Sequence, residues 1–331
     1  MRRLHVLTSV IAYLFVALPA ADDSALAVQP TAPLGAQTPA PEPVLPGAVA
    51  LIQDEADTPG LPRHFRMMSD PFPAGAEAPL PSRAGLDALR ASGSAEFSAA
   101  QLEAVVERVG RPLIVVDLRL ESHGFLAGLP VSWFALHDQV NVVRSLLEVQ
   151  QDERRRLDAA AAEGAVPVLV RTERSEHGTI SAGEPATLPA RPALTERELV
   201  AALGLGYFRV PATDYLPPTA ENVDRFVAFA AALPPETWLH VHCHAGDGRT
   251  TTFLAIWDMM HNAGTVSVDH IVRRQALIGP LDLFHVGSPE DWRYPFQVER
   301  VAFIRRSYEY ARANTPTGFI VPWSVWSATR L

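Results

Sequence analysis

Cysteine is almost absent from this sequence, and lysine is absent altogether. Cys243 is the only cysteine among 331 residues. Since a single cysteine cannot form an intrachain disulfide, a disulfide-stapled fold is excluded. All 28 basic residues are arginine, and the formal net charge is −9. Because an acidic chain repels polyanions, we expect no nucleic-acid partner, and a small anionic ligand would need a local cluster of arginine side chains.

Long apolar runs are scarce as well, and the one that stands out is N-terminal. Residues 1–27 combine two early arginines, an apolar run from residue 6 to about residue 20, and the small-residue stretch Ala25-Leu26-Ala27. This pattern is typical of a cleaved signal peptide, and the run is shorter than the ~20 residues of a spanning helix. We therefore expect an exported protein, periplasmic or secreted, with no membrane association in its mature form. An uncleaved N-terminal anchor is the alternative.

Residues 28–50 are rich in proline and small side chains. They cannot bury enough apolar surface to offset the entropy of ordering, so we expect a disordered linker. The remaining residues, 51–331, are assigned to one folded domain. The apolar fraction of the chain, 48%, is sufficient for a well-buried core.

Strand and helix patterns alternate beyond residue 94, after a loop-rich stretch. Such alternation predicts an α/β fold with a mostly parallel central sheet flanked by helices, which binds ligands at the carboxyl ends of its strands. Residues 175–192 are predicted to be a loop or small hairpin. Strands are expected at 112–119, 165–173, 206–210 and 237–242, and helices at 98–109, 139–163, 195–203, 219–233, 249–262 and 299–312.

Cys243 comes directly after the strand predicted at 237–242, in the stretch CHAGDGR. Gly246 and Gly248 allow the backbone to turn tightly with its N–H groups pointing inward. The helix that begins at about Arg249 aims its positive end at the same point. This arrangement predicts a cradle for a phosphate group. It also favours a thiolate, because such surroundings lower cysteine pKa values from about 8.5 to roughly 3.5–7.5.

Neighbouring side chains complete a candidate catalytic set. Arg249 can hold two phosphate oxygens, Thr250 can donate to the sulfur, and His242 can orient the loop from behind. Asp214 follows another strand at the same sheet edge, where it can protonate a departing oxygen. The alternatives are a buried, inert cysteine and an aspartate that belongs only to a turn before prolines.

Four motifs occur in order: VVDLRLESHGFLAGLPVSW, ATDYLPPTAENVDRF, HCHAGDGRTT and VPWSVW. Together they resemble the bacterial protein-tyrosine-phosphatase-like phytases, also called cysteine phytases, from about Leu61 to Trp326. The resemblance implies a tyrosine-phosphatase-like α/β domain with a small β-rich domain. It also implies stepwise, metal-independent hydrolysis of myo-inositol polyphosphates through a cysteinyl-phosphate intermediate, without a cofactor.

Carried onto this sequence, the resemblance makes Cys243 the nucleophile, Arg249 the phosphate-binding arginine and Asp214 the general acid. The segment between Cys243 and Arg249 is then expected to surround the transferred phosphate. Outer substrate contacts are expected from side chains that could instead be surface ion pairs. The expected substrate-binding residues are His244, Ala245, Gly246, Asp247, Gly248, Arg63, Arg66, Asp138, Arg293 and Arg300.

Two positions and one stretch depart from the pattern of the family; the stretch, residues 171–180, has Arg171, Arg174 and His177 but no lysine. Asp247 places a carboxylate inside the cysteine loop, so we expect it to face outward toward an arginine. Tyr215 follows the general acid where relatives can have histidine. No metal-ligand spacing such as H-E-x-x-H is present, so no metal site is predicted, and His123 is interpreted as structural.

The sequence thus predicts an exported phytase that uses a cysteine nucleophile. A phosphatase of phosphotyrosine or of another phosphomonoester is the rival enzyme. A module that binds inositol phosphates without hydrolysing them is the rival from another class.

Overall fold

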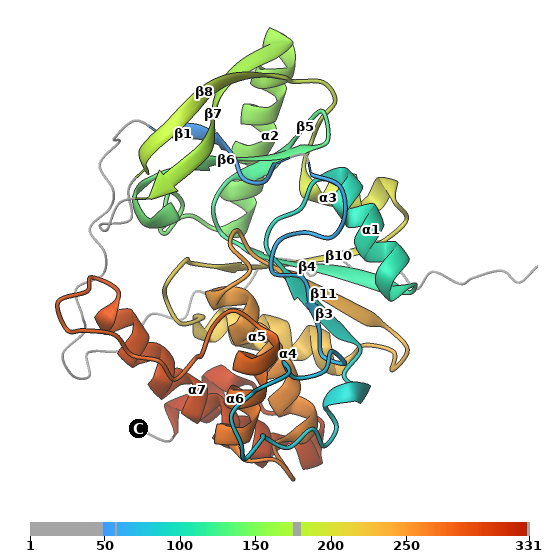
Figure 1. Ribbon diagram of the computed structural model, residues 1–331, viewed down its shortest axis with the longest axis vertical. Helices are drawn as coiled ribbons and strands as arrows, with labels where there is room; N and C mark the ends of the chain where they lie inside the picture. The colour runs from blue at the N-terminus through green and yellow to red at the C-terminus, as the bar shows by residue number, and fades with distance from the viewer. Residues whose placement is uncertain (1–48, 57, 175–179, 330–331) are drawn as a thin grey trace, which may run out of the picture. The chain divides into compact units, whose positions relative to one another are not determined.

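The computed structural model describes residues 49–56, 58–174 and 180–329, all within one compact unit (Figure 1). The predicted signal peptide and residues 28–48 of the predicted linker lie outside the described residues. The first strand, β1 (Ala50–Gln53), begins at the last residue assigned to that linker.

The central sheet has five strands in the order β10-β4-β11-β3-β2. Its first four strands run parallel to one another, and the short edge strand pairs antiparallel with β3. The predicted mostly parallel sheet is therefore confirmed. The strands are β2 (Arg66–Met67), β3 (Ala91–Ser94), β4 (Leu113–Arg119), β10 (Gly206–Ala212) and β11 (Trp238–His242).

Helices cover both faces of this sheet (Figure 1). Side chains alternate along β4, so that Val115 packs with α1 and α3 while Val116 packs with α4 and α5. Capping boxes begin α1 at Ser98 and α3 at Thr195, as the sequence predicts. The helices are α1 (Ala99–Val109), α3 (Glu196–Ala202), α4 (Ala220–Ala231), α5 (Gly248–Asn262), α6 (Val268–Ile278), α7 (Tyr294–Asn314) and α8 (Trp323–Ala328), with 3₁₀ turns η1 (Leu86–Ala88), η2 (Leu136–Asp138) and η3 (Thr315–Thr317).

A second, six-stranded sheet has the order β8-β7-β1-β6-β5-β9 and is mostly antiparallel. It packs against α2 (Leu146–Glu163) around a separate apolar cluster that includes Val131, Leu157 and Val168. Its strands beyond β1 are β5 (His123–Leu126), β6 (Leu129–Phe134), β7 (Ala165–Arg174), β8 (Ile180–Pro189) and β9 (Ala193–Leu194).

Several elements differ from the sequence predictions, which also did not include α8 or the strands β1, β2, β3, β5, β6 and β9. The helix predicted at 139–163 begins only at Leu146, because a capping box at Ser145 and Glu148 sets its start. Residues 180–189, predicted as loop or small hairpin, form a ten-residue edge strand, and edge strands tolerate proline. Helix α6 was not predicted.

Helix α5 positions the candidate site. Almost all of its side chains are buried, from Arg249 at its start to Asn262 at its end. It packs against β3 and β11 and against α6 and α7. A helix that is buried on every side has little freedom to shift, so the loop that leads into it is firmly anchored.

Candidate active site

Cys243 lies in the short connection between β11 and α5, at the carboxyl end of the central sheet, and its side chain is buried. The cysteine loop, residues 243–249, folds back on this side chain. The Gly246 N–H donates to Cys243 Sγ at 3.3 Å, and the Thr250 hydroxyl donates to the same sulfur at 3.2 Å. Two hydrogen-bond donors, one from the backbone and one from a side chain, therefore converge on the sulfur.

The two glycines of this loop have different reasons to be there. Gly246 has a φ of +78°, and a Cβ at this position would lie 2.4 Å from the backbone nitrogen of Ala95. Only glycine fits such a place. Gly248 has no left-handed φ, and a Cβ there would meet nothing within 4 Å. The conformation of the loop therefore requires glycine at position 246 but not at position 248.

Arg249 is held from behind by a carboxylate that the sequence analysis did not identify. Its Nη1 and Nη2 donate to the two oxygens of Glu121 at 2.6 and 3.0 Å, and Nη1 also donates to the Ala212 carbonyl at 3.2 Å. Burial opposes the charge of Arg249, but Asp214 and Glu121 outweigh it and hold the pKa of Arg249 well above its usual value. The guanidinium therefore stays charged and fixed at any accessible pH.

Asp214 lies in the loop after β10, and the structure brings it to Arg249 as predicted. Its Oδ1 is 3.2 Å from Arg249 Nε, and its backbone carbonyl accepts a hydrogen bond from Gln139 at 3.1 Å. Its carboxyl group is only slightly exposed to solvent. A carboxylic acid, a cationic arginine and a thiol thus meet at one sheet edge, where four parallel strands end.

Three aromatic rings join the loops around this site. His137 stacks on Trp292 with ring centroids 4.1 Å apart, and Tyr215 meets Trp292 edge-on at 4.7 Å. His137 and Tyr215 both have left-handed backbones, with φ of +56° and +65°, which cost energy unless their surroundings fix them. Each ring directly precedes or follows a candidate site residue in the chain, so the cluster ties the Asp214 loop to the Arg293 loop.

A cavity of about 250 Å³ opens above the cysteine loop. Its lining includes three arginines and the candidate acid. The lining residues named by the sequence analysis are Asp214, Ala245, Asp247, Gly248, Arg249, Arg293 and Arg300. The other lining residues are Tyr215, Leu216, Pro217, Pro218, Thr252, Leu281, Phe296 and Gln297.

Comparison with known proteins agrees with this geometry. The family model for PTP-like phytases, described by the words inositol hexakisphosphate, matches residues 116–261. A PTP-like phytase from Bdellovibrio bacteriovorus is 32% identical, with a TM-score of 0.65, and the match covers 85% of this chain and 95% of that one. This chain belongs to the PTP-like phytase family.

Two longer proteins are also similar. The PTP-like myo-inositol phosphatase from Mitsuokella multacida, solved with myo-inositol-(1,3,4,5)-tetrakisphosphate, is 35% identical with a TM-score of 0.77, over 84% of this chain and 49% of that one. The effector protein hopD2 of Pseudomonas syringae pv. tomato is 30% identical over 256 residues, which is 74% of this chain and 52% of hopD2. The chain thus spans about half the length of each of these two relatives.

Two arginines expected to bind substrate lie elsewhere in this family member. Arg63 pairs with Glu55 at 3.3 Å and lines a different cavity, of about 390 Å³, together with Arg171. Arg66 is buried behind the cysteine loop, where its guanidinium donates to the His64 and Gly246 carbonyls and to the Thr251 hydroxyl. Neither side chain is among the residues that line the cavity above Cys243.

Asp138 and His244, also expected at the substrate, are buried against each other. His244 Nδ1 lies 2.8 Å from Asp138 Oδ2, and its other ring nitrogen lies 3.6 Å from Asp54. Asp138 is not among the residues that line the cavity above Cys243, and its role in binding substrate stays a prediction. This pair instead connects the cysteine loop to the segment after β1.

Asp247 faces outward, as expected, but its partner is a histidine and not an arginine. Its Oδ1 lies 2.7 Å from His64 Nδ1, and the same ring nitrogen lies 3.0 Å from the Ala245 carbonyl. The carboxylate is 41% exposed. It borders the cavity, and solvent together with His64 moderates its repulsion of an anionic ligand.

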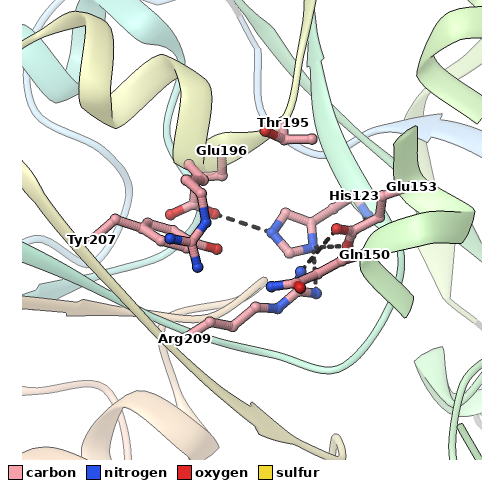
Figure 2. A pocket seen from close by; sticks show the side chains of 8 residues that line it. His123, Gln150, Glu153, Thr195, Glu196, Tyr207 and Arg209 are labelled. Carbon is pink, nitrogen blue, oxygen red and sulfur yellow. Dashed lines mark hydrogen bonds and ion pairs between the residues drawn. The ribbon is translucent and has the colours of Figure 1, made fainter. Parts of the chain in front are cut away.

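His123 occupies a buried ionic cluster beside a cavity of about 190 Å³ (Figure 2). Its Nδ1 lies 2.8 Å from the Glu121 carbonyl and its Nε2 lies 3.0 Å from Glu196. Burial opposes its protonation, but Asp117 outweighs it and raises the pKa of His123 well above the usual value. Its contacts join strands to α3, which is consistent with the structural role predicted from the sequence.

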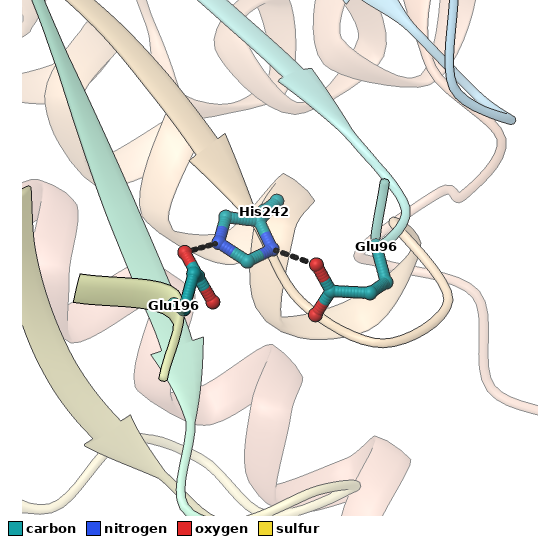
Figure 3. A group of neighbouring side chains, drawn as sticks. All are labelled: Glu96, Glu196 and His242. Atoms are coloured by element: carbon teal, nitrogen blue, oxygen red, sulfur yellow. Dashed lines mark hydrogen bonds and ion pairs between the residues drawn. The ribbon is translucent and has the colours of Figure 1, made fainter. Parts of the chain in front are cut away.

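His242 does not contact the cysteine loop through its ring. Its Nε2 lies 2.8 Å from Glu196, and its Nδ1 lies 3.8 Å from Glu96 (Figure 3). These three groups, and two similar buried sets, are close enough to hold a metal ion, which residue spacing alone did not reveal. In each set one carboxylate already pairs with an arginine: Glu96 with Arg119, Asp117 with Arg209 and Glu121 with Arg249.

Proposed function

We propose that this chain is an exported phosphatase that hydrolyses myo-inositol hexakisphosphate and lower inositol polyphosphates. One observation carries the proposal: the Cys243 sulfur accepts hydrogen bonds from Gly246 and Thr250 beside an Arg249–Asp214 pair. Membership of the PTP-like phytase family supports the substrate class, as does the inositol tetrakisphosphate complex of the Mitsuokella relative.

The proposed reaction has two steps. In the first, the Cys243 thiolate attacks phosphorus, the ester P–O bond breaks, and Asp214 gives its proton to the departing inositol oxygen. In the second, water attacks the cysteinyl phosphate, Asp214 takes a proton from that water, and the S–P bond breaks to release inorganic phosphate and the thiolate. Arg249 and the N–H groups of the cysteine loop hold the phosphate oxygens throughout.

Arg249 must change partners when substrate arrives. Glu121 occupies both terminal nitrogens and Asp214 faces Nε. A bound phosphate would take over the side of the guanidinium that faces Asp214, while Glu121 keeps the opposite side. Displacement of Asp214 from Arg249 then leaves its carboxyl group near the departing oxygen, and the negative phosphate favours its protonated form.

The decisive assay measures phosphate release from inositol hexakisphosphate by wild type and by Cys243→Ser, with and without a chelator. We expect wild-type turnover that the chelator leaves unchanged. The serine variant should lose turnover but still bind the substrate in calorimetry, because the backbone cradle remains. Turnover by Cys243→Ser, or inhibition by the chelator, would refute the cysteine mechanism. Wild-type binding without turnover would favour the binding module.

Two parts of the proposal need separate tests. A higher kcat/KM for phosphotyrosine peptides than for inositol hexakisphosphate would transfer the assignment to a protein phosphatase; the similarity to an effector protein makes this comparison necessary. The proposal that the protein is exported rests on the sequence pattern of residues 1–27 alone. Fractionation of expressing cells should find the mature chain outside the cytoplasm, and its N-terminal sequence should begin after the predicted leader.

A further inference from the structure

Arg66 is an unusual buried arginine. Its side chain is 2% exposed and lies behind the cysteine loop. Its Nη1 donates to the carbonyls of His64 and Gly246, each at 3.0 Å, and its Nη2 donates to the Thr251 hydroxyl at 2.9 Å. One planar guanidinium therefore holds the cysteine loop and the first turn of α5 in a fixed relation.

The contact with Gly246 bears directly on the sulfur. The N–H of Gly246 donates to Cys243 Sγ, while its carbonyl accepts from Arg66. A glycine at φ +78° has few internal restraints and can move readily to other backbone conformations. Some outside group must fix its orientation, and Arg66 is positioned to do so.

The charge of Arg66 also lacks a direct partner. Within the described residues, none of the hydrogen bonds and ion pairs that the guanidinium makes involves a carboxylate. Burial lowers the pKa of Arg66 to about 10, while Cys243 and Asp247 act in the opposite direction, so the group remains a cation at neutral pH. A buried cation without an adjacent carboxylate stabilises any anion placed near it.

The surroundings are shaped around this side chain. Gly279 ends α6 beside Arg66, and a Cβ at Gly279 would lie 2.8 Å from Arg66 Nε. Cys243 interacts electrostatically with Arg66 from β2 and with Arg249 from α5. Asp247 within the loop acts on Arg66, and Asp214 and Glu121 act on Arg249. Arg249 already faces Glu121 and Asp214, which makes Arg66 the less compensated of the two cations.

We propose that Arg66 is a positioning residue for the proposed phosphatase reaction. It fixes the Gly246 peptide groups so that the cysteine loop keeps its anion-binding shape, and its charge supports the Cys243 thiolate from the buried side. This inference rests on the proposed function. It concerns the reactivity of the Cys243 thiol, so it can be tested without measuring turnover. It replaces the direct substrate contact that the sequence analysis assigned to Arg66.

Alkylation of Cys243 by iodoacetamide provides the test, because the chain has no other thiol. Rates are measured from pH 5 to pH 9, with and without inorganic phosphate. Loss of a charge-assisted contact changes an equilibrium by about 10–150-fold. We therefore expect Arg66→Gln to slow alkylation at pH 6 by at least about tenfold, to move the rise of the rate to higher pH, and to weaken protection by phosphate. Arg66→Lys should restore most of the rate at pH 6, since it keeps the charge.

Arg274→Gln is the matched control. Arg274 is also fully buried and also contacts α5, through Asp258, but it lies near the other end of that helix. The Arg274→Gln variant should have a lower thermal stability than wild type and an unchanged pH profile of alkylation. An unchanged profile in Arg66→Gln, or an equal shift in Arg274→Gln, would overturn the proposal.

The Arg66→Lys variant also covers the case in which Arg66→Gln does not fold. A lysine ammonium cannot hold both Gly246 and Thr251, so Arg66→Lys should still bind phosphate several-fold more weakly than wild type. Full phosphate protection in Arg66→Lys would then overturn the proposal. If wild type hydrolyses no phosphoester at all, the proposed function fails while these comparisons stay interpretable.

Discussion

The arginines around the cysteine loop lie in opposite settings. They are exposed at the front, where the cavity opens, and buried at the back, inside the protein. At the front, Arg293 is 51% exposed and pairs with its neighbour Asp291. At the back, Arg66, Arg119 and Arg249 are almost inaccessible to solvent. Water and salt screen the front strongly, whereas buried charges act at nearly full strength. The back is therefore suited to fix one phosphate for chemistry, and the front is suited to select the rest of the substrate.

The back is also tied together by a network of buried ion pairs. Arg119 donates to Asp54, Glu96 and Glu121, and Glu121 in turn accepts from Arg249. Burial would raise the pKa of Glu121, but Arg249 and Arg119 outweigh it and hold that pKa well below its usual value. A change to any one of these groups leaves a buried charge uncompensated, so we expect little tolerance there.

The largest effect in this comparison is expected from Asp214→Asn. The variant keeps the size of the side chain but cannot supply a proton. Loss of a general acid costs roughly 10²–10⁴-fold in rate, so turnover of inositol hexakisphosphate should fall by that amount. The loss should be much smaller with aryl phosphates whose phenolate leaves without a proton. Initial rates on the two substrate types give the answer, and an equal loss on both would remove the acid role.

A smaller and more selective effect is expected from the front. Arg293→Ala should reduce kcat/KM for inositol hexakisphosphate by about 10–150-fold, the value of a charge-assisted contact, and should hardly alter hydrolysis of a small aryl phosphate. Added salt should shrink the difference between wild type and variant. Steady-state kinetics at low and high ionic strength provide the measurement.

Arg305→Ala is the control for this variant. Arg305 lies on α7 with a similar exposed fraction, 53%, but does not line the cavity above Cys243. Its removal should leave both substrates unaffected. If Arg293→Ala slows both substrates equally, or if Arg305→Ala matches it, the front of the loop does not select substrate.

The sequence predicted the local parts of the site and missed the distant ones. The Cys243 loop, Arg249 and Asp214 follow strands whose ends must meet at one edge of a parallel sheet, so their assembly was predictable. Glu121 was missed, although it lies two residues after the Arg119 that ends β4, because spacing along one strand says nothing of an arginine on another. Arg66 and Asp138 lie near the cysteine loop, but neither lines the cavity above Cys243. Whether a side chain reaches a ligand or a neighbour depends on packing that no local motif encodes.

The smallest expected effect compares two histidines on β11. His240 and His242 are both fully buried, but His240 meets the hydroxyls of Ser92 and Ser94, each at 3.0 Å, whereas His242 meets Glu196. Burial lowers the pKa of His240 well below its usual value, and the charge of His242 adds to that effect. Burial also disfavours the charge of His242, but Glu196 and Glu96 outweigh it and raise its pKa.

These opposite shifts predict opposite pH dependences of stability. The raised pKa of His242 contributes stability that is fully present below the unfolded value of about 6.5 and is lost as pH rises through the folded value. The lowered pKa of His240 costs stability at acid pH, and this cost disappears as pH rises toward about 6.5. Thermal melts from pH 5 to pH 9 should therefore show that His242→Gln flattens the alkaline decline, while His240→Gln flattens the acid one. If both variants flatten the same side of the curve of thermal stability against pH, the two histidines have the same charge state. The opposite pKa shifts assigned to them would then be wrong.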